Sequence, residues 1–352
     1  MRAVQWDAPE TLSGVELPAP HARDGEVVIE VAHCGICGSD LHSFKSGFAA
    51  RPGQVLGHEF CGTVVEAQGV DGVTVGDRVT ARPLIPCGRC RSCLAGETQL
   101  CDVGVSQGIG YGLRGAFAER VLVPHAVLDR TLFALPDEVG DRAGALVEPL
   151  AVGLHAIGQA EASAGELVVV LGAGPIGLAV LIFLGLAGVE GVIVADPSAL
   201  RRDAARRLGA ALTVDPASES TIDAVAAVTG RGASGASARA DVVIDCAGVP
   251  AAFEDALRLA RPGGRVVLCA MYGRRVEMRP DRLTSNELTL RGSVGYRDEF
   301  PSVIATLAKG DLDASTLVSH ELPLERIDEA FRIQADPAVS LKVLVTPGVR
   351  VP

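Results

Sequence analysis

The sequence predicts an α/β protein of two domains, one mainly antiparallel β and one a doubly wound parallel sheet. Three observations predict this class. The chain has 352 residues, about the length of two domains. Residues 1–149 contain short alternating stretches separated by turn residues, whereas from about residue 150 apolar strands alternate with helical stretches. Hydrophobic residues make up 48% of the chain, so both domains can bury a core.

The first region predicts strands rich in β-branched residues. Gly-Asp and Pro-Gly pairs separate them, which is typical of antiparallel strands joined by turns. After residue 295 the chain returns to mixed character. The expected strands are 27–31, 62–66, 77–80 and, near the end, 341–345, and the expected late helices are 300–308 and 324–333.

The middle region predicts buried parallel strands, because its strand candidates are continuously apolar rather than alternating. Helical stretches between them favour a doubly wound sheet. A segment at 231–239, rich in glycine and serine, predicts a surface loop without assigned function. The expected strands are 168–171, 192–195, 242–245 and 266–268, with helices at 198–208 and 251–259.

A glycine motif follows the first of these strands and opens an apolar helix. In such a motif the first glycine makes a tight turn, the second lets backbone approach a pyrophosphate, and the third permits close helix packing. Proline suits the first helical turn, and the helix N-terminus favours phosphate. A turn needed only for strand–helix packing is the alternative. The residues expected to bind a dinucleotide are Gly172, Gly174, Pro175, Ile176 and Gly177.

Asp196 ends the second strand, nineteen residues beyond Gly177. A carboxylate there accepts hydrogen bonds from ribose hydroxyls and repels a 2′-phosphate, which favours NAD over NADP. Arg201 and Arg202 weaken this inference, because either could meet a phosphate. A helix N-cap is the alternative role for Asp196.

Four cysteines in one short loop form the most specific motif of the chain. Cys87, Cys90, Cys93 and Cys101 have the spacing C-x2-C-x2-C-x7-C. Thiolates so spaced can converge on one tetrahedral Zn²⁺. Unrelated buried thiols or two disulfides are the alternative. A closed four-thiolate site has no open position for substrate, so it predicts a structural role.

A second metal site is suggested by residues that could supply three ligands and leave one position open. Cys37 and His58, with a carboxylate from Glu59 or Glu148, would form such a catalytic zinc site. Each of these residues also has an alternative role without a metal: Cys37 as a core thiol, His58 as a core histidine, and Glu59 or Glu148 as a surface charge. Spacing alone does not decide between these readings.

The order of the motifs resembles that of zinc-dependent medium-chain dehydrogenases, most closely the branch with sorbitol, threonine and 2,3-butanediol dehydrogenases. The resemblance covers nearly the whole chain. It implies a GroES-like catalytic domain of residues 1–149 and 295–352, interrupted by a Rossmann NAD-binding domain of residues 150–294. The motifs that carry it are Cys37-Gly-Ser-Asp-Leu-His, Gly57-His-Glu, the four-cysteine loop, Glu148-Pro-Leu-Ala-Val-Gly and the glycine motif.

The resemblance also implies roles for individual residues. Cys37 and His58 match catalytic zinc ligands, and Glu59 matches a glutamate that ligates or orients the metal. Glu148 matches a glutamate that ligates directly or through water, and Cys34 matches no ligand. The remaining matches are a proton relay of Ser39 and His42, Lys342 near the pyrophosphate and Arg201 beside the adenosine ribose, with Phe48, Tyr111, Tyr296 and Arg297 as substrate-pocket candidates.

The activity implied by this resemblance is reversible oxidation of a secondary alcohol, of polyol, vicinal diol, amino alcohol or cyclitol type. The implied cofactors are NAD and two Zn²⁺ per chain, one catalytic and one structural. A homo-oligomer is expected, with a tetramer favoured over a dimer. Two alternatives stay open: a non-catalytic NAD- and zinc-binding interaction module, and a zinc-free, NADPH-dependent reductase of the same superfamily.

Charge and cysteine content exclude other classes. With 32 basic and 43 acidic residues the net charge is −11, which argues against nucleic-acid or anionic-membrane partners. Nine cysteines and an N-terminus without a secretory apolar segment predict a reducing, cytoplasmic location. Residues 167–189 lack charges, but their glycines and proline predict a buried strand, turn and helix rather than a membrane span.

Overall fold

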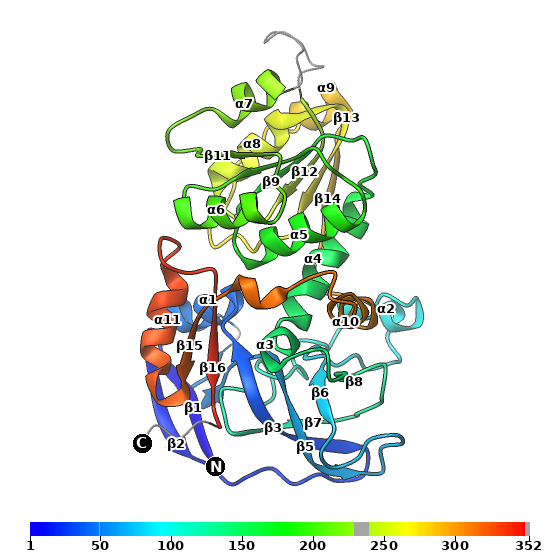
Figure 1. Cartoon of the computed structure of the whole chain (residues 1–352), viewed down its shortest axis with the longest axis vertical. Coiled ribbons are helices and arrows are strands. Elements are labelled where there is room, and N and C mark those ends of the chain that lie inside the picture. Colours follow the sequence, from blue (N-terminus) through cyan, green and yellow to red (C-terminus); the bar gives the residue numbers. More distant parts are fainter. Residues whose placement is uncertain (49, 229–238, 349–352) are drawn as a thin grey trace. The chain divides into compact units, whose positions relative to one another are not determined.

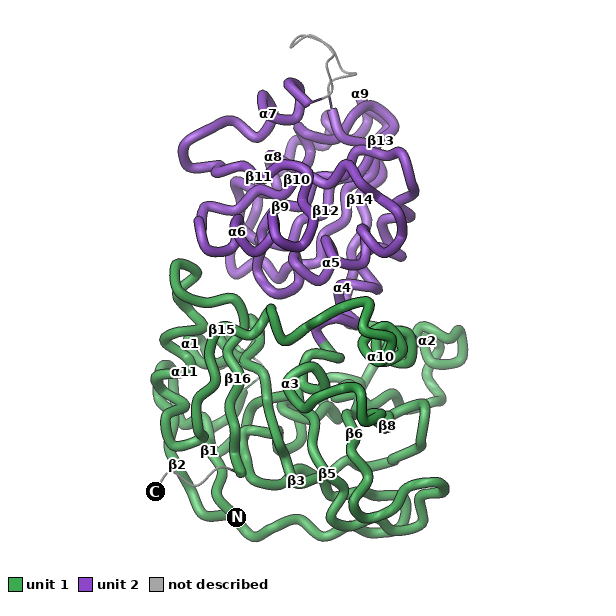
Figure 2. Tube along the Cα trace, viewed as in Figure 1, with its two compact units in different colours: residues 1–148, 296–352 green, residues 149–295 purple. Residues whose placement is uncertain are grey.

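The computed structural model describes residues 1–48, 50–228 and 239–348 (Figure 1). Most of the loop predicted at 231–239 therefore lies outside the described residues. The chain forms two compact units (Figure 2). Unit 1 consists of Met1–Glu148 with Tyr296–Pro352, and unit 2 is Pro149–Gly295. The middle of the chain thus forms one unit, while the two flanking segments build the other together.

Unit 1 contains two β-sheets. The first has the strand order β2-β1-β4, and the second β15-β16-β3-β5-β6-β8 with β7 also paired to β3. All pairs are antiparallel except β15 with β16. The strands are β1 (Arg2–Ala8), β2 (Thr11–Glu16), β3 (Glu26–Gly35), β4 (Gln54–Val55), β5 (Glu59–Gln68), β6 (Arg78–Ala81), β7 (Arg120–Val123), β8 (Leu132–Ala134), β15 (Val318–Pro323) and β16 (Lys342–Thr346).

The strands predicted at 27–31, 62–66 and 77–80 fall on β3, β5 and β6. β3 and β5 are longer than predicted, because their ends carry polar side chains that break the apolar pattern. His33 of β3, for example, lies beyond the predicted range 27–31, although the strand continues to Gly35. β3 lies inside the sheet, bonded to β5, β7 and β16, and its C-terminal end leads to Cys37, one of the predicted ligands.

Short helices complete unit 1. Phe331 packs its ring against Phe44 and Phe117, with centroid distances of 5.1 and 5.7 Å, and so fixes the first helix on the core. The helix predicted at 324–333 begins as a 3₁₀ turn and continues as an α-helix. The elements are α1 (Gly38–Ser46), α2 (Arg91–Leu94), α3 (Asp141–Gly144), α10 (Phe300–Ala308), α11 (Ile327–Ala335), η1 (Thr98–Leu100), η2 (Ala314–Leu317) and η3 (Leu324–Arg326).

Unit 2 is a six-stranded sheet in the order β11-β10-β9-β12-β13-β14, with every pair parallel. The predicted doubly wound sheet is confirmed. The strand order proceeds outward from β9 to β11 and returns beside β9 as β12, so the carboxyl ends of β9 and β12 form the topological switch point at which such sheets bind ligands. The strands are β9 (Val168–Leu171), β10 (Val192–Ala195), β11 (Leu212–Val214), β12 (Ala240–Asp245), β13 (Ala260–Leu268) and β14 (Thr289–Gly292).

The helices of unit 2 follow the strands, as the alternating pattern predicted. They are α4 (Val147–Ala160), which leads into the unit, α5 (Pro175–Leu186), α6 (Ala199–Arg207), α7 (Thr221–Val228), α8 (Pro250–Leu259) and α9 (Asp281–Asn286). The uncharged stretch 167–189 is divided between β9 and α5. Among the described residues, no helix combines the length and apolarity required to cross a membrane.

Candidate metal centres and dinucleotide site

Three potential ligands from two elements of unit 1 meet in one place. Cys37 is the N-cap of α1, His58 precedes β5, and Glu59 is the first residue of β5. One ligand atom from each lies within 4.8 Å of the other two. A thiol, an imidazole and a carboxylate form a donor set that suits Zn²⁺ and leaves a fourth position for substrate.

Two glycines make this convergence possible. Gly57 has φ +92°, and a Cβ there would lie 2.8 Å from the sulfur of Cys34. A Cβ on Gly35 would lie 2.2 Å from a carboxylate oxygen of Glu59. The turn before His58 and the space for Glu59 therefore both require residues without side chains.

A buried carboxylate without a role in the sequence analysis lies behind His58, at ion-pairing distance. The Nδ1 atom of His58 lies 3.5 Å from an oxygen of Asp40, which is 2% exposed. Asp40 also accepts a hydrogen bond of 2.9 Å from the amide of Cys37. A carboxylate behind a ligand histidine fixes its ring and tautomer. Asp40 could have been found from its position inside the Cys37-Gly-Ser-Asp motif.

The surroundings of His58 favour a positive charge. Burial disfavours the protonated imidazole, yet the charge of neighbouring acidic groups, Asp40 among them, acts in the opposite sense, and the pKa of His58 is raised well above its usual range. Its Nδ1 atom is buried and makes no hydrogen bond with the described residues. A bound cation would satisfy this electrostatic preference, so the residues present fit Zn²⁺.

Glu59 is paired with a lysine inside unit 1. The ammonium of Lys342 donates to its two oxygens at 2.8 and 2.6 Å and to the carbonyl of Ile36 at 3.1 Å. Lys342 is 2% exposed and Glu59 is fully buried. An ammonium group has three donors, and these contacts use all of them. The structure thus places Lys342 on Glu59, where the resemblance had assigned it to the pyrophosphate of a dinucleotide.

Glu148 lies outside the group of three mutually close ligand atoms. It stands in the first turn of α4, is 8% exposed, and burial raises its pKa to about 7, although His58 opposes this shift. A buried carboxyl with such a pKa can hold or release a proton near neutrality. Glu59 therefore lies among the three mutually close donors, whereas Glu148 lies outside that group.

Ser39 and Tyr111 bring hydroxyl groups to the other side of His58. The hydroxyl of Tyr111 lies 3.2 Å from Nε2 of His58 and 3.2 Å from Oγ of Ser39. Burial raises the pKa of the Tyr111 phenol above its usual range, so it stays protonated. His42 is three residues beyond Ser39 in α1, which places both on one helix face.

The other substrate-pocket candidates lie in different environments. Tyr296 is fully buried and packs its ring 4.9 Å from that of Phe300, so it is a core residue. Phe48 is half exposed, and Arg297 is partly exposed with a buried Nε atom that has no hydrogen-bond partner among the described residues. Of the four, Tyr111 is the one in hydrogen-bonding distance of a proposed ligand.

The four-cysteine loop gathers its sulfurs within 4.8 Å of one another. A tetrahedral zinc with sulfurs at about 2.3 Å needs sulfur separations of roughly 3.8 Å, which small movements would reach. All nine cysteines are free thiols, so the loop holds no disulfide. Amide groups, the Cys93 amide first, lower the pKa of Cys90 to about 6, which favours the thiolate that binds metal.

Replacing Cys90 by serine is expected to remove one zinc per chain and lower Tm by at least about 5 °C, because a three-thiolate loop binds zinc less tightly. Metal analysis and thermal unfolding measure both effects. Ser92→Ala lies in the same loop without touching a ligand atom and should change neither. A Cys90→Ser protein of unchanged Tm and assembly, but with a specific defect in hydride transfer, would contradict the structural role.

The glycine motif of unit 2 has the shape of a phosphate cradle. Gly172 has φ +92°, and a Cβ there would meet the amide of Ala247 at 2.9 Å. A Cβ on Gly177 would lie 1.9 Å from the carbonyl of Gly172. A Cβ on Gly174, by contrast, would meet nothing closer than Arg201, at 3.7 Å. Close packing therefore explains why Gly172 and Gly177 have no side chain. Gly174, by contrast, leaves open space beside the N-terminus of α5. Pro175 and Ile176 are the first residues of that helix.

Asp196 ties this turn to the end of β10. Its two oxygens accept hydrogen bonds of 2.7 Å from the amides of Ala173 and Ser198. The N-cap of α6 is Ser198, so Asp196 does not take that role. Arg202 donates to the carbonyl of Asp196 at 2.7 Å and pairs with Asp215 at 3.2 Å. The Arg202 guanidinium is thus held by the loop, and Arg201 is the arginine beside Gly174.

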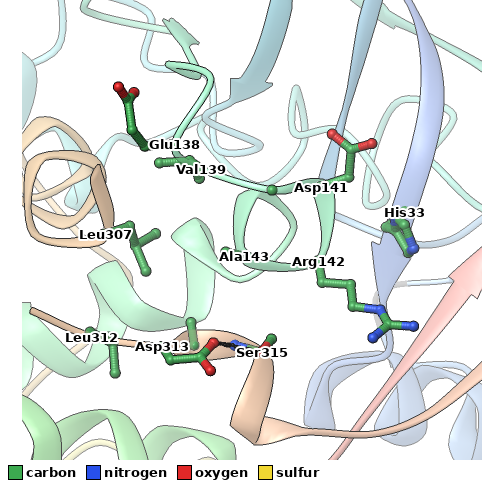
Figure 3. Close-up of a pocket in the computed structure, with 12 residues that line it drawn as sticks. His33, Glu138, Val139, Asp141, Arg142, Ala143, Leu307, Leu312, Asp313 and Ser315 are labelled. Carbon is green, nitrogen blue, oxygen red and sulfur yellow. Dashed lines mark hydrogen bonds between the residues drawn. The ribbon is translucent and has the colours of Figure 1, made fainter. Parts of the chain in front are cut away.

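A surface pocket of about 490 Å³ lies elsewhere in unit 1 (Figure 3). His33 and Arg142 border it, and both donate to Glu321, at 3.0 and 2.7 Å. Asp141 on its rim pairs with Arg78. None of its lining residues is a predicted site residue, and Glu321 and Arg78, which pair with three of them, lie outside the lining. The pocket therefore has no part in the metal centre.

Comparisons with known proteins agree with this arrangement. The family model for the alcohol dehydrogenase GroES-like domain matches residues 23–137, and the model for zinc-binding dehydrogenases matches residues 175–309. The chain is 33% identical to (R,R)-butanediol dehydrogenase of Bacillus subtilis (strain 168), over 99% of this chain and 100% of that one.

Solved structures give the same result. A zinc-binding dehydrogenase of Sinorhizobium meliloti 1021 bound to NADP has a TM-score of 0.88 and 35% identity, covering 98% of this chain and 99% of that one. A dehydrogenase of E. coli CFT073 complexed with NADH has a TM-score of 0.86 and 30% identity, covering 99% of both chains.

Proposed function

This chain belongs to the zinc-dependent medium-chain dehydrogenases, and from that premise we propose that it transfers hydride between NAD(H) and a secondary alcohol. The substrate class we propose is a polyol, vicinal diol, amino alcohol or cyclitol. The butanediol and sorbitol dehydrogenases of Bacillus subtilis, at 33% and 31% identity, support this class. The chain is accordingly an oxidoreductase.

One observation carries the proposal: a thiol, an imidazole and a carboxylate converge within 4.8 Å beside two hydroxyl groups. Cys37 and His58 would hold Zn²⁺, with Glu59 or Glu148 as the third donor. Zn²⁺ bound there supplies a Lewis acid that lowers the pKa of a substrate hydroxyl. A purely structural metal would not account for the Ser39 and Tyr111 hydroxyls beside the ligands, whereas a catalytic metal does.

The chain's own residues would handle the proton. Ser39 Oγ, at the centre, would accept a proton from the substrate hydroxyl while releasing its own toward His42, which lies on the same face of α1 and would pass a proton to solvent. Tyr111 stays protonated, so its hydroxyl can donate a hydrogen bond to Oγ of Ser39. Asp40 keeps His58 in its ligating orientation. Glu148, with its pKa near 7, is the alternative base.

For the cofactors we propose NAD rather than NADP, and two Zn²⁺ per chain. Asp196 follows β10, a position from which a carboxylate could accept hydrogen bonds from ribose hydroxyls, and the neighbouring Arg202 is already paired with Asp215. The relatives include proteins bound to NADP and to NADH, so the choice rests on these residues. The second zinc would occupy the four-cysteine loop.

We further propose a cytoplasmic homo-oligomer, with a tetramer favoured over a dimer, and no nucleic-acid partner. Free thiols throughout and two thiolate-containing metal sites support a reducing compartment. The non-catalytic module is not favoured, because the donor set of the open site is complete.

The test combines metal analysis with an activity panel. We expect two zinc ions per chain and NADH formation with at least one of a polyol, butanediol, threonine or an inositol, with NADP a much poorer acceptor. One zinc per chain and no turnover across the panel would contradict the enzyme and favour the binding module. A preference for NADP would contradict the proposal that Asp196 selects NAD, but not the proposed dehydrogenase activity.

A further inference from the structure

Two cysteines outside both metal centres lie side by side in unit 2. Cys246 follows β12 and Cys269 follows β13, and their sulfurs are 3.3 Å apart. The two strands are parallel neighbours, with Asp245 opposite Leu268, so the cysteines are the next residues in register. Neither belongs to a group of potential metal ligands among the described residues.

The pair is held in place yet accessible. The amide of Cys269 donates to the carbonyl of Asp245 at 3.0 Å, and its sulfur lies 3.3 Å from the same carbonyl. Both cysteines are partly exposed, unlike Cys34 and Cys61, which are fully buried. A small oxidant can therefore reach this pair before it reaches the core thiols.

We propose that Cys246 and Cys269 form a redox-active dithiol that low-molecular-weight disulfides oxidise to an internal disulfide, and that this oxidation weakens dinucleotide binding. Neighbouring strands lie about 4.8 Å apart, inside the roughly 4.4–6.8 Å Cα separation that a disulfide allows. No large backbone movement is required to close the bond.

The reaction balances as a thiol–disulfide exchange. The hydrogen bond with Cys269, together with burial, raises the pKa of Cys246, so the first attack falls to Cys269. Its thiolate attacks a sulfur of the small disulfide, forms a mixed disulfide and expels one small thiolate. The second cysteine, as thiolate, then attacks the protein-bound sulfur and expels the other. Two S–H bonds of the protein are lost and one S–S bond forms, while the small disulfide is reduced to two thiols.

The consequence for the dinucleotide follows from what Cys246 contacts. Its amide donates to the carbonyl of Leu171, directly before Gly172, at 2.8 Å. A Cβ on Gly177 would lie 3.5 Å from the Cβ of Cys246. Closing the sulfurs from 3.3 Å to about 2.05 Å reorients the side chain of Cys246, which lies beside the glycine turn, and so alters the packing of that turn without a large backbone movement. This part of the inference rests on the proposed function, whereas disulfide formation does not.

The experiment treats the full-length, zinc-loaded protein with oxidised glutathione, and with dithiothreitol as the reduced reference. We expect an intact mass lower by two hydrogens and a Cys246–Cys269 linked peptide. The Kd for NAD should rise about three- to tenfold on oxidation and return on reduction. Zinc content is followed in parallel, and should stay constant because the metal-bound thiolates are spared.

Serine variants distinguish the roles of Cys246 and Cys269. Cys246→Ser should take up one glutathione at Cys269 and form no internal disulfide. In Cys246→Ser/Cys269→Ser the Kd for NAD should be the same after treatment with oxidised glutathione as after treatment with dithiothreitol. Absence of the linked peptide in oxidised wild type overturns the dithiol, even if the variants fold poorly. A disulfide that leaves the Kd unchanged overturns the coupling to dinucleotide binding. A reduced protein that binds no dinucleotide contradicts the proposed function instead.

Discussion

Cys37→Ala is expected to lower kcat by about three orders of magnitude or more while the Kd for NAD changes less than about twofold. Cys37 is one of three donors within 4.8 Å, and its loss would leave the open site without a stable metal. A Lewis acid contributes several kcal/mol at the transition state, and about 4 kcal/mol corresponds to 10³ in rate. The dinucleotide residues are all in unit 2, so NAD binding should persist.

Steady-state kinetics, calorimetry with NAD and metal analysis together measure this change. Zinc should fall from two to one per chain. Cys34→Ala is the matched control, because this thiol lies three residues away, is fully buried and ligates nothing. It should retain both zinc ions and most of the activity. Full activity in Cys37→Ala would remove Cys37 from the metal site and with it the proposed centre.

Lys342→Met is expected to destabilise the protein by about 3–5 kcal/mol, the typical cost of leaving one partner of a buried ion pair alone. Lys342 is 2% exposed and Glu59 is fully buried, so water cannot replace the lost ammonium. Chemical unfolding of the zinc-free protein measures the effect. Glu59→Gln/Lys342→Met removes both charges and should recover much of the loss.

Comparison of the zinc-loaded and zinc-free forms of Lys342→Met addresses which glutamate ligates the metal. If Glu59 is a ligand, Zn²⁺ replaces the missing ammonium and the destabilisation shrinks when the protein is loaded. If Glu148 is the ligand, the destabilisation stays similar in both forms. A Lys342→Met protein as stable as wild type without zinc would show that the pair with Glu59 contributes nothing to stability.

The sequence predicted the interior strands of unit 2 best. The segments 168–171 and 192–195 coincide with β9 and β10, because each is continuously apolar and ends at a polar or glycine residue. β3 was predicted too short, since its continuation through Ala32 and polar His33 breaks the apolar pattern and does not show that pairing runs on to Gly35. Local patterns thus predict strands that are buried on both faces better than those that are half exposed.

The metal centre was predictable where its residues form local motifs. Cys37, His58 and Glu59 converge in the structure as a ligand set requires, although their assignment to zinc remains a proposal. The contact between Lys342 and Glu59 was not predictable, because it joins residues 283 positions apart through the pairing of β16 with β3. Such a contact depends on the completed sheet and leaves no local signal.

The position of β16 has a consequence for protein synthesis. Domains generally fold as units while the chain emerges from the ribosome, the N-terminal one first. Here unit 1 begins at Met1 but lacks β15, β16 and the counter-ion of Glu59 until residues 296–352 have been made. Unit 2, a continuous segment, is complete earlier. During translation, therefore, residues 1–148 lack the strand partner of β3 and the counter-ion of Glu59 while the whole of unit 2 is already available to fold.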